Sequence, residues 1–369
     1  MAPTLPRTTK ALVLQKSPPG REPLYHDAVV QEQPIPALKP GEVLVKMSAA
    51  AFNHRDLWLR KGMYTQIEVG STFGADGAGT VIAAADAADP LLKQRVFLTP
   101  MHGWESDING PESQYGILGS TAFPPIGTFS EYVVVPRAEV IPTPGHLSDE
   151  EIAAWPLAGV TAWRSIAVLA RVEAGQNILI TGIGGGVALI AMQLCVAMGA
   201  SVYVTSGNKE KIAKAVKLGA KGGANYNDAA WPAQIAALVK KNTPARPTLD
   251  AVIDSGGAEI MGKVGAHLKM GGRIVCYGMT AGPTIAMTMR EVMRGQQLLG
   301  AFPPAHDDGL ARDLAAATAF IARHRIVPVV SAVLPGLEAA ERGFEMMKTG
   351  EQFGKIVVRI GAGGVKANL

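Results

Sequence analysis

The segment Ile178–Ala200, ILITGIGGGVALIAMQLCVAMGA, constrains the fold more than any other stretch of the sequence. Its first four residues are apolar or β-branched, as in a strand buried on both faces, and glycines separate them from a long apolar run. Gly182, Gly185 and Ala188 lie three apart, which suits a sharp turn, close approach of a ligand and packing of a helix on its strand. The segment therefore predicts a strand, a tight turn and a helix whose N-terminus favours an anion.

A second strand, expected at Ser201–Thr205, follows this helix directly and completes a βαβ unit of about 30 residues. This context favours a dinucleotide whose pyrophosphate is bound at the turn. The residues expected to bind it are Gly182, Gly185, Gly186 and Val187. A P-loop is disfavoured because no Gly-Lys-Ser/Thr sequence closes the turn. Flavin and S-adenosylmethionine sites use similar glycine turns, so the glycines alone do not decide between them.

Composition predicts a soluble globular protein. Of the 369 residues, 48% are hydrophobic and 18% are charged, and no apolar run has the length of a membrane span. The net charge of +4 comes without clusters of Lys and Arg, so neither a nucleic-acid partner nor a membrane partner is expected. Cys195 and Cys276 lie in apolar segments and Met1–Lys10 lacks a signal-like apolar core, which favours the cytoplasm.

Two patterns divide the chain. From Ala11 to about Pro144 the sequence indicates short strands separated by Pro- or Gly-containing turns: ALVLQ, EVLVKM, GTVIAA, RVFL and EYVVVP. From Ser148 strands alternate with helices, which is typical of a parallel sheet covered on both faces: ILIT, SVYVT, LDAVID, RIVCY and QLLGAF. The short final strand, Lys355–Ile360, is expected to join the N-terminal β domain.

Several further motifs, in this order, make the sequence resemble the medium-chain dehydrogenase/reductase superfamily, and within it the zinc-lacking, quinone oxidoreductase-like branch that includes zeta-crystallin. They are Asn53-His-Arg-Asp56, Gly74-Ala-Asp-Gly-Ala-Gly79, Gly127-Thr-Phe-Ser-Glu-Tyr132, Leu157-Ala-Gly-Val-Thr-Ala-Trp163, Leu218-Gly-Ala220, Asp250-Ala-Val-Ile-Asp254 and Gly354-Lys-Ile-Val-Val358. The resemblance implies an α/β fold with a doubly wound parallel Rossmann sheet, residues 158–302, and a GroES-like β-barrel domain, residues 1–157 and 303–369.

No metal is expected. Zinc enzymes of this superfamily carry a Cys in the first motif and a His–Glu pair in the second, where this chain has Asn53, Ala75 and Asp76. A catalytic zinc needs three protein ligands and a structural one needs four. The lobe of four cysteines is also missing, and a Gly/Pro/Ser-rich stretch, Met101–Pro125, stands in its region. His54 has no matched partner as a ligand.

The sequence favours NADPH as the cofactor. NAD-specific sites place an acid at the end of the second strand, and that position is Ser206 here. Ser206, Asn208 and Lys211 are expected to bind the 2′-phosphate. The alternative is that Lys211 belongs to an ordinary solvated helix face. The resemblance also implies Asn53 and Thr161 at the nicotinamide, Tyr226 at the phosphates, and Ser255, Tyr277 and Lys355 at the rim. Tyr226 has the alternative of a core aromatic.

The leading hypothesis is an NADPH-dependent reductase of quinones, enones, enals or enoyl thioesters. Tyr64, eight residues after Asp56, has the spacing at which related reductases carry a cleft tyrosine, and with Asn53 it is the expected catalytic pair. A phenol can donate a proton to an enolate, but Tyr64 could instead only shield the nicotinamide. A non-catalytic NADPH-binding protein and an S-adenosylmethionine enzyme are the alternative functions. A homodimer or homotetramer, joined near Pro283–Met289, is what the resemblance suggests.

Overall fold

The computed structural model describes residues 5–104, 111, 113–301 and 310–361. These residues form two compact units. The first unit holds the described residues up to 157 together with residues 330–361, and the second holds the described residues from 158 to 329. The boundary between the units after residue 157 is the one that was expected.

In the first unit, seven of the described strands form one mostly antiparallel sheet in the order β16-β17-β3-β4-β5-β9, with β8 paired to β3. The hairpin β1–β2 and the short pair β6–β7 accompany it. Apolar side chains of these strands, including Val45, Val96 and Val358, form a buried core. The strands are β1 (Thr8–Gln15), β2 (Asp27–Pro34), β3 (Glu42–Ala51), β4 (Asp76–Ala84), β5 (Arg95–Leu98), β6 (Met101–His102), β7 (Gly116–Ile117), β8 (Tyr132–Pro136), β9 (Val140–Pro142), β16 (Val330–Pro335) and β17 (Lys355–Arg359).

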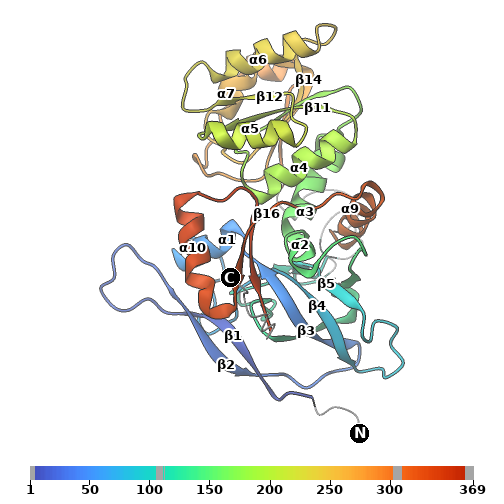
Figure 1. The fold of residues 1–369 in the computed structure, drawn as a ribbon. Helices are drawn as coiled ribbons and strands as arrows, with labels where there is room; N and C mark the ends of the chain where they lie inside the picture. The colour runs from blue at the N-terminus through green and yellow to red at the C-terminus, as the bar shows by residue number, and fades with distance from the viewer. Residues whose placement is uncertain (1–4, 105–110, 112, 302–309, 362–369) are drawn as a thin grey trace, which may run out of the picture. The chain divides into compact units, whose positions relative to one another are not determined.

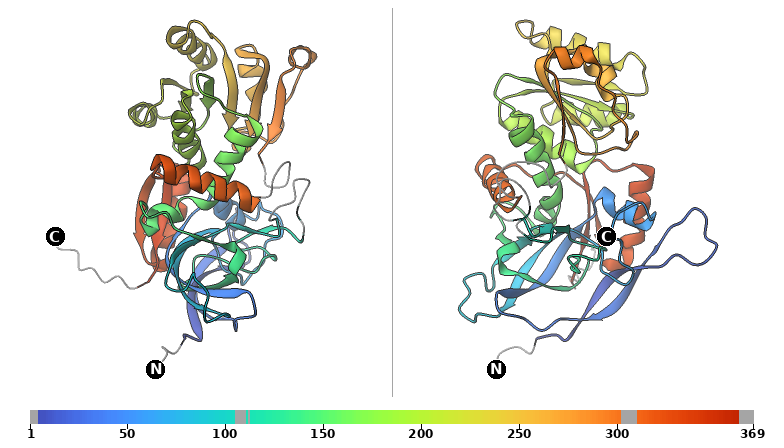
Figure 2. Two further views of the ribbon diagram at one scale, coloured as in Figure 1. Left: turned by 90° about the vertical axis from the view of Figure 1, so that its right-hand side faces the viewer. Right: turned by 180° about the vertical axis from the view of Figure 1, so that it is seen from behind.

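The two ends of the chain share this sheet. Strand β17 pairs antiparallel with β3, with Val357 opposite Ala51, and β16 pairs parallel with β17. Figure 1 shows the red C-terminal strand beside the blue β3, and the views of Figure 2 show the same neighbours from two other sides. The expectation that the last strand returns to the N-terminal domain is confirmed.

Three helices of the first unit lie against its sheet. The first and last of them, α1 and α10, are linked by Arg60, whose guanidinium lies 4.0 Å from the ring centre of Tyr25 and 4.5 Å from that of Phe344. Arg60 also pairs with Glu341 at 2.5 Å. The helices are α1 (His54–Arg60), α2 (Asp149–Ala153) and α10 (Ala340–Thr349), with short 3₁₀ turns η1 (Arg137–Glu139) and η3 (Leu337–Ala339).

Six described strands of the second unit form a parallel sheet in the order β12-β11-β10-β13-β14-β15. The order reverses between β10 and β13, which is the switch point where doubly wound sheets bind ligands. The parallel sheet expected from the alternating pattern is therefore confirmed. The strands are β10 (Asn177–Ile180), β11 (Ser201–Ser206), β12 (Gly222–Asn225), β13 (Leu249–Asp254), β14 (Leu268–Cys276) and β15 (Gln297–Gly300).

Helices cover both faces of this sheet. In β12, a Cβ on Gly222 would contact Leu238 of α6 at 3.1 Å, whereas one on Gly223 would meet Ile212 of α5 at 2.8 Å. Successive strand residues face opposite sides, so α5 and α6 lie on opposite faces. None of the helices in the described ranges is long and apolar enough to cross a membrane. The helices are α3 (Pro156–Trp163), the π-helix η2 (Arg164–Leu169), α4 (Gly186–Ala197), α5 (Lys209–Lys217), α6 (Trp231–Asn242), α7 (Ile260–Val264), α8 (Met289–Met293) and α9 (Leu310–His324).

Helix α9 packs with the second unit, although the expected boundary at residue 302 assigned it to the first. Arg164 of η2 forms a buried ion pair with Asp313 of α9. The rings of Trp163 and Phe320 also meet, with centroids 5.5 Å apart. These contacts join residues far apart in the sequence, so no local sequence signal indicated where α9 belongs.

Candidate active site

Asn53 lies directly before helix α1 and is held at both its backbone and its side chain. Its backbone N–H donates to Asp56 Oδ2 at 2.8 Å, which ties it to the first turn of the helix. Its Nδ2 donates to Asp76 Oδ2 at 2.9 Å, and its Oδ1 accepts from Lys355 Nζ at 2.6 Å. Two predicted site residues, Asn53 and Lys355, are thus brought together although 302 positions separate them.

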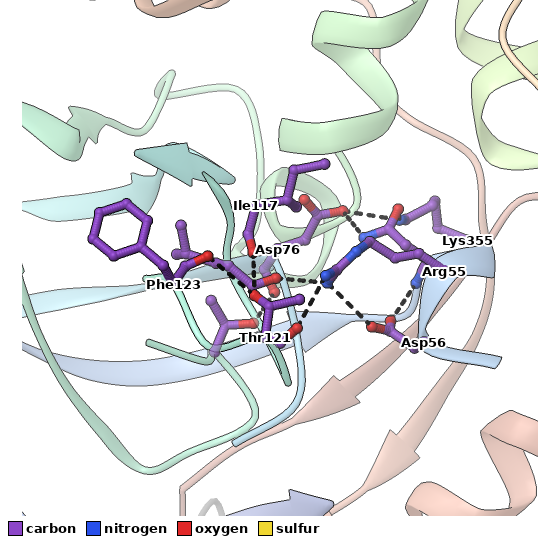
Figure 3. Close-up of polar contacts among 11 residues, drawn as sticks. Arg55, Asp56, Asp76, Ile117, Thr121, Phe123 and Lys355 are labelled. Carbon is purple, nitrogen blue, oxygen red and sulfur yellow. Dashed lines mark hydrogen bonds and ion pairs between the residues drawn. The ribbon is translucent and has the colours of Figure 1, made fainter. Parts of the chain in front are cut away.

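Asp76, the first residue of β4, is the centre of this cluster (Figure 3). Its side chain is completely buried and Lys355 is 5% exposed. Oδ2 accepts from Asn53 and, at 2.9 Å, from Lys355, while Oδ1 accepts from the backbone N–H of Leu157 at 2.8 Å. A buried carboxylate is tolerated when it is paired and hydrogen-bonded. Both oxygens of Asp76 are engaged, so this is a saturated buried ion pair.

The donor set of this cluster does not fit zinc. Of the three positions that carry the ligand motifs in zinc enzymes, Ala75 offers only a methyl group. The oxygens of Asn53 and Asp76 already bind the ammonium of Lys355, whose positive charge opposes a second cation. Zinc sites are built from thiolates, imidazoles and carboxylates that are available to the metal. Lys355 was expected at the cofactor rim, and its described bonds are those within this cluster.

Arg55 and Asp56 form a second buried pair on α1, with Arg55 Nη1 3.8 Å from Asp56 Oδ1. Burial raises the pKa of the Asp56 carboxyl to about 6, although the nearby Arg55 lowers it. Within the described residues Asp56 Oδ1 makes no hydrogen bond. A carboxyl group whose pKa is moved toward neutrality by burial is a candidate functional group. In the sequence, Asp56 is notable only as the last residue of the motif Asn53–Asp56.

Tyr64 lies just beyond α1, half-buried against the core of the first unit. The Arg55 guanidinium carbon is 4.8 Å from the centre of its ring. Among the described residues its hydroxyl makes no hydrogen bond, including none to Asn53. The expected catalytic pair is therefore not joined directly. Tyr64 instead contacts Arg55.

In the second unit, β10, the glycine turn and α4 follow one another in the order strand, turn and helix that the sequence predicted. Gly182 and Gly184 have φ of +67° and +130°, in the region that favours glycine. Gly185 precedes α4 and has no side chain to cap it. The first N–H groups of the helix, those of Gly186 and Val187, are therefore available to an anion.

Ser206 ends β11, and no acid stands there. Its Oγ accepts from the N–H of Asn208 at 3.2 Å, and Asn208 Oδ1 in turn caps α5 by accepting from the N–H groups of Glu210 and Lys211. The Lys211 side chain lies over the glycine turn, because a Cβ on Gly184 would be 2.9 Å from Lys211 Cδ. Burial, with the charge of Lys214, lowers the pKa of Lys211. The remaining lysines of α5 are exposed, as a solvated face requires: Lys209, Lys214 and Lys217.

Three other predicted residues lie at neighbouring strand ends on the same edge. Tyr226 follows β12 and is 50% exposed, with its hydroxyl close to Gly207, so it is not a core aromatic. Ser255 follows β13, and its Oγ lies 2.5 Å from where a Cβ on Gly182 would stand. Tyr277 follows β14, and burial raises its pKa despite a hydrogen bond with Ser255. The carboxyl ends of five adjacent parallel strands thus carry the predicted cofactor residues of this unit, apart from Thr161.

Thr161 lies in α3, away from those strand ends in the sequence. Its carbonyl accepts a hydrogen bond from Ser165 Oγ at 2.7 Å. Three residues later, at Arg164, the helix widens into the π-helix η2, a rare form that is frequent at functional sites. No sequence pattern indicated this change of helix type.

Asp254, at the end of β13, is a buried residue that the site prediction missed. It accepts from Thr181 Oγ1 at 2.6 Å and from the N–H of Gly257 at 2.6 Å, and Cys276 donates to it at 3.8 Å. It thereby holds the loop that carries Ser255. An acid at the end of the otherwise apolar strand LDAVID was the available signal.

Comparisons with known proteins agree with both units. Residues 39–145 match the family described as alcohol dehydrogenase GroES-like domain, and residues 186–322 match that described as zinc-binding dehydrogenase. A relative from Leptosphaeria maculans, the zinc-type alcohol dehydrogenase-like protein YogA, is 40% identical, covering 88% of this chain and 92% of its own. The chain belongs to the medium-chain dehydrogenase/reductase superfamily. Acryloyl-coenzyme A reductase of Metallosphaera sedula is 25% identical, over 95% of this chain and 99% of its own.

Among solved structures, an NAD-dependent alcohol dehydrogenase is 31% identical with a TM-score of 0.79, covering 95% of this chain and 100% of its own. The expected Rossmann and GroES-like architecture of the superfamily is confirmed. As a member of the medium-chain dehydrogenase/reductase superfamily, the chain is of an oxidoreductase type. The name of the Leptosphaeria maculans relative includes zinc, whereas in this chain the oxygens of Asn53 and Asp76 are already bonded to Lys355.

Proposed function

We propose that this chain is a zinc-independent, NADPH-dependent reductase that transfers hydride to a conjugated carbonyl compound: a quinone, an enone or enal, or an enoyl thioester. The observation that carries the proposal is the saturated cluster of Asn53, Asp76 and Lys355, in which the side-chain oxygens of Asn53 and Asp76 accept hydrogen bonds from the Lys355 ammonium. This supports an assignment to the zinc-lacking, quinone oxidoreductase-like branch of the superfamily. Acryloyl-coenzyme A reductase, a relative along nearly the whole chain, supports the thioester class.

The choice of NADPH rests on residues at the end of β11. Ser206 stands where an acid would bind a ribose 2′-OH, so a 2′-phosphate meets no carboxylate repulsion there. Lys211 lies against the glycine turn, and an anion beside it would offset the burial that lowers its pKa. The solved relative is named NAD-dependent, so the proposal depends on these two residues and not on that name. Asn208, Tyr226, Ser255 and Tyr277 complete the proposed cofactor set with the glycine turn and Thr161.

Conjugate reduction suits a site without a metal. The bound cofactor supplies the hydride. Addition to a conjugated carbonyl spreads the negative charge into an enolate, which hydrogen-bond donors can stabilise. Tyr64, half-buried and with its hydroxyl not committed to another described residue, is the proposed donor and then the proton source. Asn53, whose amide is fixed by Asp76 and Lys355, is proposed to orient the reactants.

The test follows NADPH absorbance with a panel of quinones, enones, enals and enoyl thioesters, before and after exhaustive dialysis against a chelator. We expect turnover of at least one acceptor class, unchanged by chelation, with primary alcohols inactive as donors. Tyr64→Phe, which keeps the ring, should lower kcat for an enone at least about tenfold and leave the Kd for NADPH unchanged. Loss of activity with release of stoichiometric zinc would contradict the metal-independent mechanism, and binding of NADPH without any turnover would favour a non-catalytic protein.

A further inference from the structure

Arg55 binds an irregular segment of the first unit through two backbone carbonyls. Its Nη1 donates to Leu118 O at 2.6 Å and its Nη2 donates to Gly119 O at 3.0 Å. Figure 3 shows the guanidinium reaching toward the segment that carries Ile117, Thr121 and Phe123. Arg55 is 7% exposed, so these bonds are made in a place that water hardly reaches. The planar fork of arginine suits two neighbouring acceptors.

The segment that Arg55 binds has a strained backbone. Gly119 and Ser120 have φ of +93° and +56°, and a left-handed residue other than glycine is uncommon. Ser120 is 1% exposed, and within the described residues its hydroxyl makes no hydrogen bond. Gly119 lies directly on Gly74, whose backbone nitrogen would be 2.6 Å from an added Cβ. Such a conformation persists where the surroundings hold it, and such sites cluster around function.

The same guanidinium lies over the ring of Tyr64, with its carbon 4.8 Å from the ring centre. Its counter-charge is Asp56, at 3.8 Å. One buried side chain therefore contacts both the strained segment, through its two N–H···O bonds, and the ring of the proposed proton donor. The guanidinium is rigid, and its two bonds to the segment fix its plane. A shift of the segment would therefore move the ring of Tyr64, and a shift of the ring would move the segment.

We propose that Arg55 is a positioning residue for Tyr64: it sets the ring at a fixed place relative to the Leu118–Ser120 segment and so aims the phenol hydroxyl. This inference rests on the proposed function, in which Tyr64 donates the proton. Arg55 acts through Tyr64 and does not itself react. Displacing a reacting group by about 1 Å can cost roughly a hundredfold in rate, so the orientation of the ring is worth a measurable factor.

The experiment is a double-mutant cycle of Arg55→Lys and Tyr64→Phe on the full chain, with kcat measured for the most active enone and the Kd for NADPH measured in parallel. Lysine keeps the charge but can neither bind both carbonyls in one plane nor stack as guanidinium does. We expect Arg55→Lys to lower kcat about tenfold or more, with the NADPH Kd unchanged, and to have less than about a twofold effect once Tyr64 is phenylalanine. If Arg55→Lys does not fold, Arg55→Gln, which keeps one donor, takes its place.

Arg60→Lys is the matched control, because Arg60 is also buried on α1 and also stacks on a tyrosine, Tyr25. It should lower the melting temperature without a comparable loss of kcat. If Arg55→Lys lowers kcat by the same factor in the wild type and in Tyr64→Phe, Arg55 is only a structural residue and the proposal is overturned. If Tyr64→Phe itself turns over like the wild type, the proton-donor assignment fails first, and the role of Arg55 fails with it.

Discussion

The buried cluster around Asp76 and the carboxyl edge of the parallel sheet differ in how far their polar groups are bonded within the protein. At the cluster, Asp76 and Lys355 are at most 5% exposed and each bonds to partners from distant parts of the chain. At the sheet edge, Tyr226 is 50% exposed and the N-terminus of α4 has no side-chain cap. The first arrangement already satisfies its charges, whereas the second offers donors to a ligand.

This difference separates the groups that hold the fold from those that recognise a molecule. A charge whose partners are all within the protein contributes mainly through the cost of removing one of them. A donor at an uncapped helix end contributes when an anion arrives. Substitutions of the ion pair Asp76–Lys355 should therefore change stability, and substitutions at the sheet edge should change affinity.

The largest effect is expected from Asp76→Asn. This change leaves the Lys355 ammonium buried without a carboxylate, and breaking a buried ion pair from one side costs about 3–5 kcal/mol of unfolding free energy. Chemical denaturation of the full chain measures it. Glu150→Gln, which breaks the more exposed pair with Arg359 in the same unit, is the control and should cost less than about 1 kcal/mol. An Asp76→Asn protein as stable as the control would show that the cluster is not a structural centre.

Asp56 differs from Asp76 in one respect. It is also completely buried, but within the described residues its Oδ1 accepts no hydrogen bond. Burial raises its pKa from 3.8 to about 6, so the folded chain holds this proton more tightly than the unfolded chain. The stability it contributes is fully present below the unfolded pKa and is lost as pH rises through about 6. From pH 4 to 7.5, the unfolding free energy of the wild type relative to Asp56→Asn should fall by about 2–3 kcal/mol. A pH-independent difference would show that the carboxyl stays ionised.

The elements that sequence predicted well are those with unbroken apolar patterns. Strands β10, β11 and β13 and the glycine turn lie where ILIT, SVYVT and LDAVID indicated. Strand β12 was missed because its sequence, GGAN, has no hydrophobic pattern. Its glycines are required because helices α5 and α6 both approach it closely. Strand β16 was missed for a different reason: its sequence, VSAVLP, is exposed at alternate positions because it lies at the edge of the sheet, beside β17.

The candidate site was predictable where a residue type and its position carry the chemistry. The glycine turn and Ser206 follow from the spacing within one βαβ unit. The contacts of Arg55 were not predictable in the same way, because they depend on the fold of the 118–120 segment, whose left-handed backbone has no sequence signal at Ser120. The bonds of Asp76 to Leu157 and Lys355 also join residues that only the tertiary structure brings together.

At the sheet edge, Lys211→Ala tests recognition. A charge-assisted hydrogen bond contributes roughly 1.5–3 kcal/mol, so the Kd for NADPH should rise about 10- to 100-fold while that for NADH barely changes. Calorimetry with both nucleotides gives the two values. The exposed Lys214 on the same helix is the control, and Lys214→Ala should shift the NADPH Kd less than about twofold. Equal weakening of both nucleotides, or a wild type that prefers NADH, would contradict the 2′-phosphate assignment.

The smallest effect on cofactor binding is expected from alkylation of Cys276. This residue ends β14 at the same edge of the sheet, but its thiol donates to the buried Asp254. Burial, with the negative charge of Asp254 to which it donates at 3.8 Å, raises the pKa of its thiol to about 12. At pH 8 about one thiol in ten thousand is then ionised, and the thiolate is the reactive form. Treatment with iodoacetamide at pH 8 for an hour should leave NADPH binding unchanged, and Cys276 should be labelled only after unfolding. Stoichiometric labelling of the folded chain within minutes, located at Cys276 by mass spectrometry, would show that this strand end is as open to solvent as Tyr226.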